Sequence, residues 1–96
     1  MAGVPTAAIF LPHIGTTVSL PDGQTLTLVA VDQPSGGARD TAPRPPFSLL
    51  LRGRSTPVVP EGMHRLVFAD DAGFELYLIP IHTPSRDHQD YQVVFN

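Results

Sequence analysis

The sequence predicts an all-β fold, either a small antiparallel β-sandwich or a partly open barrel of about six strands, with a short N-terminal helical turn. Short apolar runs, many of them alternating with polar residues, recur along the chain between clusters of Gly, Pro and Asp. The sequence contains no heptads and no internal repeat at a fixed period. Its 96 residues suffice for a single domain, 1–96, with one modest core.

The first expected elements are a helical turn and a hairpin. The apolar run Ala7–Leu11 suits one or two turns of helix, and Pro12 limits its extension. Two strand-like runs follow, Thr16–Leu20 and Thr25–Val31. Between them, Pro21–Gly23 has turn chemistry, because Pro fixes φ and Gly accepts a positive φ. We therefore expect the two runs to form an antiparallel hairpin.

A long loop is expected to separate the two halves of the chain. Residues Gln33–Pro46 are rich in Pro, Gly, Ser and charge, and they show no apolar periodicity. Loops of this length in compact domains are typically either functional or mobile. Two interpretations therefore stay open for this segment, a contact surface and a mobile connector.

Four more strands are expected in the second half of the chain: Phe47–Arg52, Met63–Phe68, Phe74–Ile81 and Tyr91–Phe95. Gly53 is expected to close the first of these strands. Asp70–Gly73 should join the second and third as a tight hairpin loop, with the adjacent carboxylates in Asx-turn geometry. A terminal strand needs pairing to stay ordered, so we expect the last strand to pair beside Phe74–Ile81.

The strand Phe74–Ile81 has two apolar faces, because Phe74, Leu76 and Leu78 alternate with Tyr77, Ile79 and Ile81. One face can be covered by the rest of the domain, and the other by a terminal segment or by another subunit. Contiguous exposed apolar surface normally marks an interface. The residues expected at such an interface are Leu50, Arg52, Arg54, Tyr77, Ile79, Ile81 and Val94.

Arg52 and Arg54 flank Gly53 at the end of a predicted strand. Two guanidinium groups in this position could recognise a carboxylate on a partner chain. A solvated strand end with local salt bridges explains the same residues, since charges at strand ends discourage edge pairing. The sequence leaves both interpretations open.

The composition narrows the classes of partner. Charged residues make up 16% of the chain, against about 25% in typical soluble domains, and sparse surface charge indicates a buried interface. The net charge of −3 and the absence of lysine argue against a nucleic-acid partner, because phosphate binding depends on clustered Lys and Arg. The absence of cysteine excludes a disulfide framework, a thiolate metal site and a Cys nucleophile.

Targeting signals are not evident in the sequence. The N-terminal residues include no basic side chain before the short apolar run, which therefore fails as a secretory signal. No run approaches the roughly 20 apolar residues of a membrane span. We expect a cytoplasmic protein, or a component of a particle that is released without a signal peptide.

Catalytic and metal-binding motifs are not recognised. His82, His88 and Asp87 share one loop and could bind a metal, as in a metal-dependent hydrolase, but their spacing matches no zinc motif, so solvated loop residues are expected instead. The chain contains no G-x-S-x-G nucleophile motif and no phosphate-binding loop. The prediction is a non-enzymatic protein without a catalytic residue, metal or cofactor.

Five segments carry a family resemblance: Phe10-x-Pro-His-x-Gly, Phe47-Ser-Leu-Leu-Leu-Arg-Gly, Pro60-Glu-Gly-Met-His-Arg-Leu, Gly73-Phe-Glu-Leu-Tyr-Leu-Ile-Pro-Ile and Tyr91-Gln-Val-Val-Phe-Asn. In these segments the chain resembles a bacterial family of short proteins of unknown function. It departs from the family in the expanded loop Gln33–Pro46. The resemblance implies a compact β domain without an established activity, encoded near proteins similar to phage tail-collar components.

The expected function is a structural or assembly module that self-associates, or that docks on a protein partner in a tail-like or fibre-like particle. The alternative is a small-ligand-binding β-barrel. In that case aromatic residues would line the pocket, as is common in ligand sites. The residues proposed for that pocket are Phe68, Phe74, Tyr77 and Tyr91.

Overall fold

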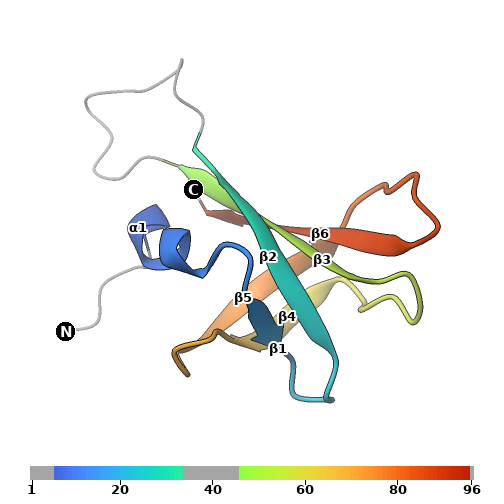
Figure 1. Ribbon diagram of the computed structural model, residues 1–96, viewed down its shortest axis with the longest axis horizontal. Helices are drawn as coiled ribbons and strands as arrows, with labels where there is room; N and C mark the ends of the chain where they lie inside the picture. Colours follow the sequence, from blue (N-terminus) through green and yellow to red (C-terminus); the bar gives the residue numbers. More distant parts are fainter. Residues whose placement is uncertain (1–5, 34–45, 96) are drawn as a thin grey trace.

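A computed structural model describes residues 6–33 and 46–95 of the chain (Figure 1). The predicted all-β fold with a short N-terminal helical turn is confirmed, and the six strands form a closed antiparallel barrel. The contact surface or connector predicted for the long loop falls on residues 34–45, outside the described residues. The elements are α1 (Ala7–Phe10), a 3-10 turn η1 (Leu11–His13), β1 (Thr17–Ser19), β2 (Thr25–Asp32), β3 (Phe47–Arg54), β4 (Gly62–Val67), β5 (Gly73–Pro80) and β6 (His88–Phe95).

The barrel consists of two meanders, β1–β2–β3 and β4–β5–β6, which meet along β3 and β6. β3 and β6 are paired over their full length, from Phe47 opposite Phe95 to Arg54 opposite His88 (Figure 1). The expected pairing of the last strand beside β5 is present only at Ile79–Gln92 and Pro80–Tyr91. The terminal strand is therefore held mainly by β3.

Two short seams close the barrel around the β4–β5 hairpin. On one side, β4 pairs with β1 at a single position, Ser19 opposite Val67. On the other side, β5 pairs with β6 at two positions. The other four strands form a continuous antiparallel sheet in the order β1-β2-β3-β6. The hairpin therefore completes the barrel with few backbone pairs to its neighbours.

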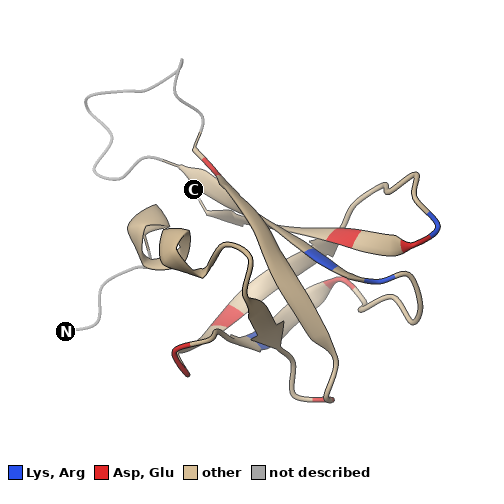
Figure 2. Cartoon of the chain, viewed as in Figure 1, with Lys and Arg blue, Asp and Glu red and all other residues tan. Residues whose placement is uncertain are grey.

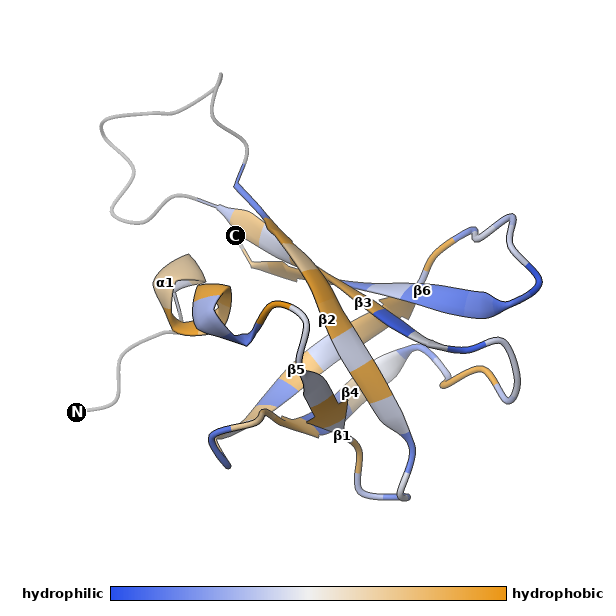
Figure 3. Cartoon of the chain, viewed as in Figure 1, coloured by the Kyte–Doolittle hydropathy of each residue, from blue (hydrophilic) through white to orange (hydrophobic). Residues whose placement is uncertain are grey.

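The core is built from the inward residues of the strands, and strongly hydrophobic residues alternate with threonines of intermediate hydropathy in the first half of β2 (Figure 3). In β5, the predicted inward residues Leu76 and Leu78 are buried. β3 buries Phe47, Leu49 and Leu51, as its alternation predicts. This packed interior is the main stabilising feature, since burial of apolar surface is the dominant favourable contribution to folding.

All five phenylalanines of the chain gather at one end of the barrel. Phe10 from α1 is completely buried, and its ring centroid lies 5.2–6.0 Å from those of the other four. Phe47 and Phe95, which face each other across β3 and β6, are stacked at 4.3 Å. The helix is too short to be stable on its own. It is held in place by the packing of these five rings, which we call the aromatic plug.

The opposite end of the barrel is closed by the connector between β3 and β4. Val59 of this connector is buried, and its backbone N–H donates a hydrogen bond to the Tyr91 hydroxyl over 2.8 Å. Tyr91 lies on β6 with its ring in the core. The bond satisfies both buried polar groups, which would otherwise destabilise the fold.

The two tight hairpin loops have the same backbone bonding. In the first, Gly23 N–H donates to Leu20 C=O, and in the second, Asp71 N–H donates to Phe68 C=O. Gly23 and Asp71 both have positive φ angles, 92° and 68°. The predicted Asx turn is present, because Asp70 Oδ1 accepts a bond from Ala72 N–H at 3.0 Å. In the second loop the residue with a positive φ is Asp71 and not the glycine, because Gly73 is the first residue of β5.

The prediction that Gly53 ends its strand is wrong, because β3 continues through Gly53 to Arg54. A Cβ at position 53 would lie 2.5 Å from Leu26 Cδ2. Glycine in a strand typically marks such a close approach. Gly53 therefore provides space for a core side chain rather than a strand terminus.

None of the helical segments in the described part of the chain has the length and hydrophobicity needed to cross a bilayer.

Candidate functional site

The outer surface of β3 and β6 brings together most of the residues predicted at an interface. The outward side chains of β3 are Ser48, Leu50, Arg52 and Arg54, and those of β6 are His88, Asp90, Gln92 and Val94. β2 adds Ala30 and Asp32, and β5 adds Ile79. We call these residues the β3–β6 face. It spans four neighbouring strands of the barrel.

The middle of the β3–β6 face is an uncharged band. The strand registers place Ala30 opposite Leu50, Leu50 opposite Gln92, and Gln92 opposite Ile79. All four side chains are half-buried. Val94, one step further along β6, is 48% exposed. The band therefore presents apolar surface to solvent with one amide at its centre.

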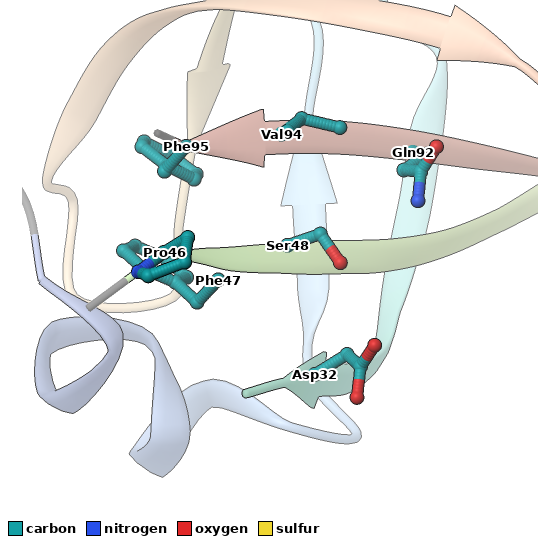
Figure 4. Close-up of a pocket in the computed structure, with 7 residues that line it drawn as sticks. All are labelled: Asp32, Pro46, Phe47, Ser48, Gln92, Val94 and Phe95. Atoms are coloured by element: carbon teal, nitrogen blue, oxygen red, sulfur yellow. The ribbon is translucent and has the colours of Figure 1, made fainter. Parts of the chain in front are cut away.

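A shallow hollow lies along this band. Its volume is about 350 Å³, and Ala30, Leu50 and Gln92 are among its lining residues. A neighbouring hollow of about 260 Å³ continues toward Phe47 and Phe95. Figure 4 shows Ser48 of β3 between Asp32 of β2 and Val94 of β6, in the order that the strand registers give. Both hollows lie on the outer surface of the sheet, where they could receive protruding side chains.

Charged residues flank the band at both ends. Asp32 lies at one end of the face, and Arg52, Arg54 and Asp90 lie at the other. The strand positions between them carry no Lys, Arg, Asp or Glu (Figure 2). Arg52 Nε lies 2.8 Å from Asp90 Oδ1, and Arg52 Nη2 lies 3.2 Å from Asp90 Oδ2. This bidentate bond raises the pKa of the Arg52 guanidinium, which stays charged. Arg52 thus forms a local salt bridge, one of the two arrangements that the sequence left open.

The second arginine is arranged differently. Arg54 lies opposite His88 on β6, and His88 Nε2 is 3.6 Å from Asp90 Oδ1. Within residues 6–33 and 46–95, Arg54 forms no ion pair. Its side chain is exposed, and a guanidinium in this position can bind a further carboxylate.

Two of the predicted interface residues lie away from the centre of this face. Ile81 follows β5 and borders the face, where its N–H donates to Asp90 C=O at 3.1 Å. Tyr77 is opposite Met63 on the β4–β5 hairpin, and its hydroxyl donates to Glu61 Oε2 at 2.7 Å. β5 pairs with β6 only at Ile79 and Pro80. Ile79 therefore belongs to the β3–β6 face, whereas Tyr77 lies on the part of β5 that pairs with β4 alone.

The aromatic residues proposed for a ligand pocket do not face a common space. Phe68 and Tyr91 are buried in the packed core, at opposite ends of the barrel. Phe74 packs against Phe10, and Tyr77 is exposed on the outside. These four side chains therefore do not line a single cavity.

The prediction that His82 and His88 are both solvated loop residues is wrong for His88, because β6 begins at that residue. His82 and Asp87 are exposed, and His88 is half-buried on β6 beside Asp90. Among the residues that the structure describes, no group of three or more His, Asp or Glu side chains is placed to hold a metal ion.

Fold and surface together define a small all-β barrel domain with a mixed apolar and charged outer face. The chain belongs to the family described as "Domain of unknown function (DUF6916)", which matches residues 5–95. This agrees with the predicted resemblance to a family of unknown function. The comparisons with curated proteins and with solved structures gave no match.

Proposed function

We propose that this protein is a non-enzymatic assembly module whose copies associate through the β3–β6 face. The observation that carries the proposal is the uncharged band of Ala30, Leu50, Gln92 and Ile79 across four strands. Val94 adds a largely exposed side chain beside it. Apolar surface that continues over several strands is costly to leave in water, and covering it favours association.

The distribution of polar groups on the face also suits a protein partner. Protein interfaces typically combine an apolar centre with a polar rim. Here the centre holds Leu50 and Ile79, and the rim holds Asp32 and Arg54. The Arg52–Asp90 salt bridge is already satisfied, so a partner that covers it leaves no isolated charge.

The wider role is an assembly role in a tail-like or fibre-like particle. Its support is the sequence resemblance to proteins encoded near tail-collar-like components, which is an argument by association. In this proposal the chain is produced in the cytoplasm and acts there, or in a particle that is released without a signal peptide. Its partners are proteins, and the face needs neither a cofactor nor a nucleic acid.

The test is the solution mass measured by light scattering across a dilution series. We expect the wild-type chain to form an oligomer and Ile79→Asp, a charge in the middle of the uncharged band, to shift it to a monomer. Met63→Asp is the matched control, because Met63 is 59% exposed and lies on β4, which is not part of the β3–β6 face. It should assemble like the wild type. Circular dichroism shows whether each variant is folded.

Two results would overturn the proposal. One is a wild-type chain that stays monomeric at every concentration. The other is a folded Ile79→Asp variant that assembles like the wild type.

A further inference from the structure

We infer that the second copy docks on the β3–β6 face in antiparallel orientation, so that Arg54 of each copy pairs with Asp32 of the other. This inference rests on the proposed self-association and specifies its geometry. It follows from the positions of the charged groups along one pair of strands.

Arg52 and Asp90 neutralise each other, and the two remaining charges of the face, Asp32 and Arg54, lie at opposite ends along the direction of the strands. Asp32 lies on β2 beside Ser48, at the end of the face where β3 begins. Arg54 is the last residue of β3, at the other end. Outward residues follow one another at every second position, a spacing of roughly 7 Å. The acidic and basic ends are thus three such steps apart, with the uncharged Leu50 between them.

Two sheets that stack face to face around a two-fold axis can run parallel or antiparallel. In the parallel orientation, an axis that runs between β2 and β3 brings Arg54 diagonally across from Arg54 and Asp32 diagonally across from Asp32, and like charges so close together are unfavourable. In the antiparallel orientation, an axis that crosses β3 between Leu50 and Arg52 brings the position of Ser48 opposite that of Arg54. Because Asp32 is the strand neighbour of Ser48, Arg54 reaches it diagonally across the interface.

The contact would form twice, because a two-fold interface uses the same surface on both copies. Arg54 is the cation suited to it, because Arg52 already holds Asp90 through two hydrogen bonds. The apolar band then lies between the two charge pairs, where the partner excludes water from it. Charge complementarity of this kind fixes the orientation of an interface more than it adds affinity.

Charge reversal tests this geometry. We expect Arg54→Asp and Asp32→Arg each to raise the dimer dissociation constant by about tenfold or more, which corresponds to about 1.4 kcal/mol. The double variant Asp32→Arg/Arg54→Asp should recover most of this loss, because the reversed charges complement each other again. Arg86→Asp is the control, since it makes the same change of charge on an exposed loop outside the face.

Sedimentation equilibrium or light scattering at several salt concentrations gives the constants. The antiparallel pairing would be overturned if Arg54→Asp left the dissociation constant unchanged, or if the double variant dissociated as readily as the single ones. Either result would leave the proposal of self-association intact. A wild-type monomer would overturn both proposals. The outcomes for orientation and for association are therefore distinguishable.

Discussion

The backbone N–H of Val59 donates a hydrogen bond to the Tyr91 hydroxyl, 2.8 Å away, inside the closed end of the barrel. The two residues are 32 positions apart and come from a connector and from the last strand. Both are almost completely buried. One hydroxyl group thus anchors the connector between β3 and β4 to the sheet that carries the β3–β6 face.

Removing this hydroxyl should destabilise the protein measurably. In Tyr91→Phe, the ring still fills its site, but the N–H of Val59 loses its partner away from water. We expect a loss of about 1–3 kcal/mol in the free energy of unfolding, measured by urea denaturation. Tyr77→Phe is the control, since the Tyr77 hydroxyl is bonded to Glu61 on the exposed surface. Equal losses in the two variants would contradict the anchoring role of Tyr91.

The aromatic plug should dominate the stability of the N-terminal segment. Phe10→Ala removes the ring that contacts four others, so we expect a loss of about 3–5 kcal/mol in the free energy of unfolding. Leu11→Ala changes a neighbouring side chain that is 42% exposed, and its effect should be much smaller. If Phe10→Ala does not fold, Phe10→Leu gives a milder test in the same denaturation experiment. A Phe10→Leu variant as stable as wild type would show that the plug is dispensable.

Two glycines should differ in their tolerance of a methyl group. A Cβ at Gly53 would lie 2.5 Å from Leu26 Cδ2, and Leu26 is buried in the core. A Cβ at Gly73 would lie 2.7 Å from Arg65 Nη2, at the end of an exposed side chain that can move. We expect Gly53→Ala to lower the thermal midpoint and to cost about 1–3 kcal/mol, and Gly73→Ala to cost less. The reverse order would show that Leu26 can repack.

The Tyr77–Glu61 hydrogen bond should be visible in a titration. The bond to the Glu61 carboxylate raises the pKa of Tyr77 above its usual value, with a smaller contribution from desolvation. The neutral phenol is therefore favoured in the folded state, and any stabilisation from this bond is lost as the pH rises through the raised pKa. NMR of the tyrosine ring carbons resolves Tyr77 from Tyr91. In Glu61→Gln the pKa of Tyr77 should fall back toward its usual value, and an unchanged pKa would exclude the bond in solution.

Local sequence signals predicted the elements well. The alternation in Phe47–Arg52 and Phe74–Ile81 marks the inward residues, because side chains in a strand point to opposite faces in turn. The turn residues Pro21–Gly23 and the Asx turn at Asp70 depend on neighbouring residues only. Such features follow from a few consecutive residues, so one sequence suffices to predict them.

The pairing of these elements with one another was harder to predict from the sequence. The pairing of β3 with β6 joins segments about 40 positions apart, and nothing within either strand specifies this partner or its register. As a result, the sequence proposed Leu50 and Ile79 for an interface without indicating that Gln92 lies between them in the sheet. It grouped Tyr77 with Ile79, and both point outward on β5, but the strand alone does not indicate that only Ile79 is paired with β6. The role of Gly53 depends on its close approach to Leu26, which lies on a different strand and far away in the sequence.

The short seams beside the β4–β5 hairpin have a consequence for the order in which the barrel opens. One backbone pair joins this hairpin to β1, and two pairs join it to β6. The hairpin is therefore held in the barrel mainly by side-chain packing. Native proteins exchange their amide hydrogens through local openings, which begin where the fewest backbone bonds must break. The hairpin should therefore detach as a unit while β2, β3 and β6 stay paired, and its amides should exchange with solvent first. The detached hairpin would take Ile79 out of the β3–β6 face, and the three strands that carry the rest of the face would be the last part of the protein to lose their protection.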